Sequence, residues 1–306
     1  MTKKNLVPEP EDGLKFIDVH CHLPFPRPKN DDRLPSDEIQ LNNYFDSGGI
    51  YLITSTIDYN TLNMTLKFIN DKNHIGFSCG WAPQTVTYTP QQKYDVEWRK
   101  WKDYVENHQS DYLAIGEVGL DFHHAMTLEK RIKQISEIEK IFEITRDFNK
   151  PYVLHVRNAA QNEVDKENLD HRFNTDDGAT KEMLRILENY NISPSRVLWH
   201  CFSGPDIYGA MLPQQGFMLS VPSSAFGTKK WRKATTNAPL ESLLTETDSY
   251  YQHPFLRGPL NVPSNVKYSI AAIAYSHNLT QKKVSDITVQ NAINFFSLPV
   301  DNFNIN

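Results

Sequence analysis

The 306-residue chain contains no apolar run close to the ~18 residues that a membrane-spanning helix needs. Its N-terminus also has no apolar core of the kind found in secretory signals, so we expect a cytoplasmic protein without a membrane partner. Cysteine is scarce, with only Cys21, Cys79 and Cys201, and none of them shows Cys-x-x-Cys spacing. An odd and sparse set of cysteines does not suit a disulfide framework and is typical of a reducing compartment.

The chain also lacks an excess of positive charge. Its net charge is −5, so the molecule as a whole does not attract nucleic acid, and a phosphodiester substrate would have to be held locally by metal ions and a few arginines. Apolar and aromatic residues are plentiful: 39% of the chain is hydrophobic, with 16 Phe, 14 Tyr and 5 Trp. We therefore expect one folded domain over residues 14–306, a flexible polar lead-in over 1–13, and a monomer.

Eight short apolar runs recur along the chain, and helical patterns separate most of them. The expected strands cover 15–20, 48–56, 74–81, 112–117, 152–155, 196–200, 216–221 and 242–248. The expected helices cover 61–71, part of 91–107, 127–148, 181–190 and 282–296. This α/β alternation predicts parallel strands, and eight of them are the number that closes a (β/α)8 TIM barrel. The alternative is an open doubly wound sheet, but no Gly-x-Gly-x-x-Gly turn follows any strand.

Two histidines stand at the end of the first expected strand. Because side chains alternate along a strand, His20 and His22 face one side while Cys21 faces the other. Two imidazoles that face one point suit a divalent cation. Alone, the pair of histidines is equally compatible with a hydrogen-bonded strand end. Ligand-type residues on other strands are needed to favour a metal site.

Further polar residues lie at the ends of later expected strands. They are Glu117 on the fourth, His155 on the fifth, His200 on the sixth and Asp248 on the eighth. In a barrel these ends share the face on which active sites lie, so six ligand-type side chains from five strands would converge. Each alone has a structural alternative: a histidine bonded to a backbone carbonyl, or a carboxylate that caps a helix or pairs with an arginine. The complete set exceeds what one metal ion needs and suits two ions.

The motifs that contain these residues resemble those of the TatD family of metal-dependent deoxyribonucleases. The matching segments, in family order, are 18–23 (DVHCHL), 116–121 (GEVGLD), 151–159 (PYVLHVRNA), 200–204 (HCFSG) and 246–248 (ETD). The resemblance covers most of the chain. It implies a TIM barrel of the amidohydrolase superfamily, a divalent metal centre and hydrolysis of DNA phosphodiesters.

The resemblance also implies a role for each ligand-type residue. His20 and His22 resemble ligands of one metal, and Glu117 resembles the carboxylate that touches both metals. His155 and His200 resemble ligands of the second metal. Asp248 resembles the carboxylate that binds a metal and handles the proton of the attacking water, and with Glu117 it makes up the expected catalytic pair. The cofactors are then two divalent ions, Mg²⁺, Mn²⁺ or Zn²⁺, and the expected substrate is single-stranded DNA or a 3′ end, in a 3′–5′ exonuclease mode.

Two further residues are candidates for substrate binding. Arg157 lies two residues beyond His155 and is suited to bind a phosphate oxygen bidentately, although an ion pair with a neighbouring carboxylate explains it equally well. Ser203 follows His200 in an expected turn whose backbone N–H groups could meet a phosphate. Aromatic residues near the strand ends are either base-stacking platforms or ordinary packing: Trp81, Phe202, Tyr250 and Tyr251.

The chain departs from the family pattern around Arg157. Asn158 stands where an acid often follows, and the polar tract 158–180 looks like a long surface insertion. These departures bear on substrate choice more than on catalysis. Two other functions therefore stay open: a metal hydrolase that acts on a small amide, lactone or phosphodiester, and a non-catalytic metal-binding protein. Glu117 favours the nuclease, because many barrels that hydrolyse small substrates bridge their metals with a modified lysine. No role is evident for His123 and His124.

Overall fold

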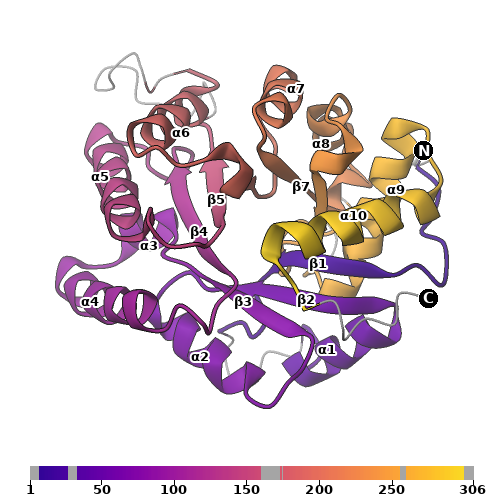
Figure 1. The fold of residues 1–306 in the computed structure, drawn as a ribbon, viewed down its shortest axis with the longest axis horizontal. Helices are drawn as coiled ribbons and strands as arrows, with labels where there is room; N and C mark the ends of the chain where they lie inside the picture. The colour runs from indigo at the N-terminus through magenta and orange to yellow at the C-terminus, as the bar shows by residue number, and fades with distance from the viewer. Residues whose placement is uncertain (1–6, 27–32, 160–172, 174, 256–259, 300–306) are drawn as a thin grey trace. The chain divides into compact units, whose positions relative to one another are not determined.

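The computed structural model describes residues 7–26, 33–159, 173, 175–255 and 260–299 (Figure 1). Most of the polar tract predicted as an insertion, residues 160–172 and 174, and the first six residues of the predicted lead-in lie outside the described residues. Within the described part of the chain, no helix is long and apolar enough to cross a membrane.

The eight strands belong to one sheet and follow one another in chain order, with helices between them, which is the (β/α)8 topology predicted from the sequence. Parallel pairing joins the first strand to the second, the third to the fourth, the fourth to the fifth, the fifth to the sixth and the seventh to the eighth. The strands are β1 (Phe16–Cys21), β2 (Gly49–Ser55), β3 (Ile75–Cys79), β4 (Ala114–Asp121), β5 (Tyr152–Arg157), β6 (Val197–Trp199), β7 (Met218–Pro222) and β8 (Leu243–Glu246).

The described part of the chain contains ten α-helices and several short 3-10 turns; eight of the helices lie between strands, and α9 and α10 follow β8. The helices are α1 (Asp37–Asp46), α2 (Tyr59–Ile69), α3 (Pro83–Tyr88), α4 (Gln91–Asn107), α5 (Leu128–Thr145), α6 (Gly178–Asn189), α7 (Asp206–Gln214), α8 (Lys229–Thr235), α9 (Val266–His277) and α10 (Gln281–Phe296). Several begin at a hydroxyl N-cap: Ser36 accepts from the N–H of Ile39, and Thr127 from that of Lys130.

The chain divides into two compact units, and each is described by itself. The first comprises residues 1–54, 67–76 and 201–306, and the second comprises residues 55–66 and 77–200. In the first unit, β7 pairs with β8, and β8 lies beside β1. Helices α9 and α10 pack on each other and against β1 and β8 (Figure 1). Val7 packs against Phe226 and Ala271 in this unit.

The second unit is built around β4 and β5, whose pairing extends from Ile115↔Tyr152 to Asp121↔Arg157. Helices α5 and α6 cover β4, and α6 also contacts β5. The backbones of β4 and β5 approach closely at Gly116, where φ is +153° and a Cβ would collide with the carbonyl of Val153. Glycine before Glu117 is thus required by the close approach of two strands.

The predicted strand ends are wrong at two important positions. β4 continues four residues past Glu117 to Asp121, and β5 continues past His155 to Arg157, so both ligand-type residues lie inside strands. Their ladder continues because Gly119 pairs with His155 and Asp121 with Arg157. The five predicted helices all exist, with ends shifted by up to three residues. The prediction of one domain over 14–306 stays a prediction.

Candidate functional site

In the first unit, three buried side chains form one candidate metal-binding group. His20 lies in β1 and His22 directly follows it, and their ring planes are at 90° with centroids 5.1 Å apart. Asp248 follows β8, and its Oδ1 lies 3.4 Å from His22 Nε2 and 3.9 Å from His20 Nε2. One ligand atom from each residue lies within 4.8 Å of the others. This is the three-ligand arrangement that catalytic metal sites commonly use.

The buried carboxylate of Asp18 holds the segment that carries Asp248. It accepts hydrogen bonds from Thr247 N at 3.0 Å and from Thr247 Oγ1 at 2.5 Å. The N–H of Asp248 donates to the carbonyl of His20 at 2.9 Å, so the two ligand-bearing segments are joined directly. Burial raises the pKa of Asp18 well above its usual value, against the lowering effect of the Thr247 hydrogen bonds. No role for Asp18 was predicted, although it opens the first motif.

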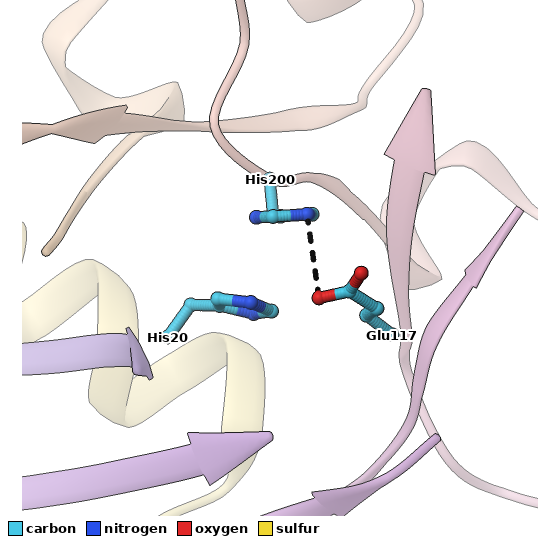
Figure 2. Close-up of side chains that lie close together, drawn as sticks. All are labelled: His20, Glu117 and His200. Atoms are coloured by element: carbon cyan, nitrogen blue, oxygen red, sulfur yellow. Dashed lines mark ion pairs between the residues drawn. The ribbon is translucent and has the colours of Figure 1, made fainter. Parts of the chain in front are cut away.

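In the second unit, Glu117, His155 and His200 form another group. His155 Nδ1 lies 3.2 Å from Glu117 Oε1 and 3.2 Å from His200 Nε2. Figure 2 marks the ion pair between His200 Nε2 and Glu117 Oε2, which are 3.8 Å apart. Glu117 and His200 are buried, and His155 is nearly so. Two imidazoles and a carboxylate thus face one another in this unit as well.

The opposite nitrogen of His155 faces a second carboxylate. His155 Nε2 lies 3.1 Å from Asp121 Oδ2, at the end of β4. Burial by itself would lower the pKa of His155, but the Asp121 and Glu117 carboxylates raise it to about 10. Burial would raise the pKa of Asp121, yet its hydrogen bonds with His155 and His124 hold it well below the usual value. Asp121 and His155 therefore form a charged pair at neutral pH.

Asp121 is itself anchored by several donors. Its Oδ2 accepts from Gln84 Nε2 at 2.7 Å and lies 2.7 Å from His124 Nδ1, and its backbone N–H donates to Gln134 Oε1. Asp121 and Gln134 are fully buried. This role of Asp121 was not predicted from the sequence. Its signal was present, because Asp121 closes the Gly116–Asp121 motif and His124, which had no assigned role, follows it three residues later.

The two residues predicted to bind substrate lie near these groups in sequence. Arg157 is exposed at the end of β5, where its carbonyl accepts from the N–H of Phe122. Ser203 is half-buried in the turn after His200. Their contact with substrate stays a prediction.

The four candidate stacking residues differ in exposure. The rings of Trp81, Phe202 and Tyr250 are buried, whereas Tyr251 is 56% exposed and lies edge-on to His22, with ring centroids 6.1 Å apart. A base can stack only on an accessible ring face, so Tyr251 is the residue of the four with a surface for this role.

Asn158, the departure from the family pattern, has a structural task. Its Oδ1 accepts from the N–H of Thr180 at 3.0 Å and its Nδ2 donates to Thr180 Oγ1 at 2.9 Å. These bonds tie the end of β5 to the first turn of α6 and satisfy one of the free N–H groups there.

The donor chemistry of both groups fits divalent metal ions. Each group combines two imidazoles with one carboxylate, a set that accepts Zn²⁺, Mn²⁺ and related ions. The His20, His22 and Asp248 group is the one whose ligand atoms all converge within its unit. The bridging role predicted for Glu117 and the number of ions stay predictions.

Comparisons with known proteins agree with the predicted resemblance. Residues 17–297 match the family model described as "TatD related DNase". The chain is 23% identical over 286 residues to the "uncharacterized metal-dependent hydrolase MJ1582" of Methanocaldococcus jannaschii, covering 92% of this chain and 97% of that one. It is 24% identical over 289 residues to human "deoxyribonuclease TATDN3", covering 93% of this chain and 95% of that one.

Among solved structures, the fold is similar to that of YJJV, a TatD homologue from Escherichia coli K12. The TM-score is 0.73 at 20% identity, and the match covers 93% of this chain and 98% of that one. The predicted TIM-barrel fold class and the resemblance to TatD proteins are confirmed.

Proposed function

This chain belongs to the TatD-related DNase family of metal-dependent hydrolases, and we propose that the bond it hydrolyses is a phosphodiester of DNA. The observation that supports this most is the convergence of His20, His22 and Asp248 within 4.8 Å, where two imidazoles and one carboxylate are buried together. The human relative is named as a deoxyribonuclease, which points to the same substrate class.

In the proposed reaction, His20, His22 and Asp248 would hold one divalent ion, and Glu117, His155 and His200 would hold a second. A bound divalent ion supplies Lewis acidity, which favours ionisation of the attacking water and offsets charge on the phosphate. The Asp248 carboxylate accepts the proton of that water. Asp121 fixes the ring of His155 so that Nδ1 faces Glu117 and His200.

We further propose that the enzyme removes nucleotides from a 3′ end of single-stranded DNA. Arg157 and Ser203 then contact phosphate oxygens of the substrate. Arg157 suits this contact because an exposed guanidinium presents a planar fork of donors to a phosphate.

The test is an assay of the purified chain with Mg²⁺ or Mn²⁺ on single-stranded DNA labelled at either end. We expect mononucleotides to be released first from the 3′ end, and we expect EDTA to stop the reaction. A parallel panel of nitrophenyl esters, lactones and amides tests the bond. Turnover of that panel without any cleavage of DNA would contradict the proposed substrate.

A further inference from the structure

One stretch of this acidic chain is free of carboxylates. Between Asp206 and Glu241 there is no Asp or Glu, while Lys229, Lys230, Arg232 and Lys233 all fall there. These four cations belong to α8, in the first unit. Lys229, Lys230 and Lys233 are exposed, and Arg232 is half-buried. A local positive surface thus exists on a chain whose net charge is −5.

Arg232 fixes the position of α8 relative to the end of β7. Its guanidinium donates to the carbonyls of Ala225 at 2.8 Å and Phe226 at 2.7 Å, in the turn that follows β7. Because α8 begins soon after this turn, Lys229 and Lys230 lie at the carboxyl end of β7. The carboxyl ends of parallel strands are the ends at which TIM-barrel enzymes place their active sites.

The same turn is bonded to the segment that follows Asp248. Ser223 Oγ donates to the carbonyl of Gln252 at 2.8 Å, and Ser224 Oγ bonds Gln252 Oε1 at 2.9 Å. Tyr251, the residue before Gln252, donates its N–H to the carbonyl of Asp248 at 2.8 Å. These hydrogen bonds, together with the peptide links from Tyr251 to Gln252 and from Ser224 to Ala225, connect Asp248 through the turn after β7 to α8.

Tyr251 adds an aromatic surface to this path. Its ring is 56% exposed and lies beside His22, with ring centroids 6.1 Å apart. An exposed aromatic ring followed by exposed cations is the combination by which proteins hold single-stranded nucleic acid, since bases stack on rings and phosphates pair with lysines.

From this arrangement we infer that Tyr251, Lys229 and Lys230 form a strip that binds a single DNA strand next to the group of His20, His22 and Asp248, independently of base sequence. This inference rests on the proposed function and adds the surface by which the substrate is held. The strip recruits the strand to a chain that is otherwise negatively charged. The alternative partner, a lipid surface, would need an exposed apolar face beside the cations, and the vesicle measurement below tests it.

The experiment measures binding, so that it does not depend on hydrolysis. The full-length Asp248→Asn chain, with Mg²⁺ present, is titrated into fluorescein-labelled oligothymidine of about 12 nucleotides, and anisotropy is followed at several salt concentrations. In this background, the K229A/K230A double variant should weaken binding about tenfold, and it should reduce the slope of log K against log[salt] by about 1.4, since each lost phosphate contact contributes about 0.7.

A matched control uses another pair of adjacent, exposed lysines in the same unit. Lys282 and Lys283 lie at the start of α10, where Ser285 Oγ donates to the carbonyl of Lys15, before β1 begins. This is the opposite end of the strand from His20 and His22. The K282A/K283A variant should keep the parent affinity and salt slope.

The stacking role of Tyr251 is tested with one variant that removes the aromatic ring and one that keeps it. Tyr251→Ala should weaken binding about tenfold without changing the salt slope, and Tyr251→Phe should restore it, because stacking uses the ring and not the hydroxyl. The inference is overturned if K229A/K230A matches K282A/K283A in both affinity and slope, or if the parent binds vesicles with 30% phosphatidylserine but no oligonucleotide. Tight, lysine-dependent binding without any hydrolysis by the wild-type chain would instead count against the proposed function alone.

Discussion

The two groups of ligand-type residues use the same chemistry but differ in how closely their side chains are paired. In the second unit, His155 lies 3.1 Å from Asp121 and 3.2 Å from Glu117, within hydrogen-bonding distance. In the first unit, the carboxylate of Asp248 lies 3.4 Å and 3.9 Å from the nearest nitrogens of the two histidines. In the second group, the protonated ring of His155 therefore interacts with the carboxylates of Glu117 and Asp121. In the first group, the distances between carboxylate and imidazole are longer.

This difference affects how metal binding at each group depends on pH. An ion that binds His155 must displace a proton whose pKa is about 10, so binding there is coupled to pH. In the group of His20, His22 and Asp248, the buried Asp18 carboxylate holds Thr247, the residue before Asp248, and so supports the segment that carries this ligand. The predictions that follow test this contrast.

The largest effect is expected for Asp248→Asn. The amide cannot accept the proton of the attacking water, so hydrolysis should slow by about 10²–10⁴-fold. The fold should persist because the backbone bond from Asp248 to His20 does not involve the side chain. Rates of DNA cleavage and circular dichroism are the measurements, with Asp206→Asn, at the start of α7 in the same unit, as the control. A variant that cleaves at the parent rate would refute the role of Asp248.

The pH dependence of metal binding should separate the two groups. As pH rises, His155 loses its competing proton, so affinity at its group should increase about tenfold per pH unit until the pH nears 10. Calorimetric titration of the His22→Ala chain with Zn²⁺ in buffers of different ionisation enthalpy reports the proton released. About one proton per ion is expected at pH 7. Release of none would show that His155 is not a ligand or is not protonated.

Asp121→Asn should weaken the second group by losing the partner that orients His155. Metal affinity should fall about 10–100-fold, the range seen when a residue that orients a ligand is removed. The number of protons released on binding should fall as well, because an amide holds the proton on His155 less strongly. Asp103→Asn, an exposed change on α4 of the same unit, is the matched control. An unchanged affinity in Asp121→Asn would mean that His155 is oriented by Glu117 alone.

The smallest effect is expected in the first unit, for Thr247→Val. This change removes the hydroxyl that donates to Asp18 and accepts from the N–H of Ser249. The free energy of unfolding should drop by about 1–3 kcal/mol, because the buried Asp18 carboxylate loses a donor. Urea unfolding in EDTA measures it, and Thr236→Val, at an exposed threonine, should change stability much less. Equal losses in the two variants would show that Thr247 does not support Asp18.

Much of the fold could be predicted because strand and helix periodicities are local properties. The eight apolar runs became the eight strands of the sheet, and the amphipathic pattern of 91–107 became α4. Five helices were not predicted: α1, α3, α7, α8 and α9. Of these, α1 has only three buried residues and α8 is mostly cationic, so neither shows a clear apolar face. The predicted end of β4 was wrong, because β4 continues beyond Glu117 by pairing with β5, with Gly119 opposite His155. Pairing with a distant strand cannot be seen in the local sequence pattern.

The sequence by itself determined the fold class, the family and the residue types from which a metal site can be built, because these follow from the order and spacing of side chains. The tertiary structure alone decided which partners orient those residues. Asp121, Gln84 and His124 meet at His155, or near it, only through the packing of separate elements. The 3.1 Å distance between Asp121 Oδ2 and His155 Nε2 depends on that packing, and this close carboxylate helps to raise the pKa of His155.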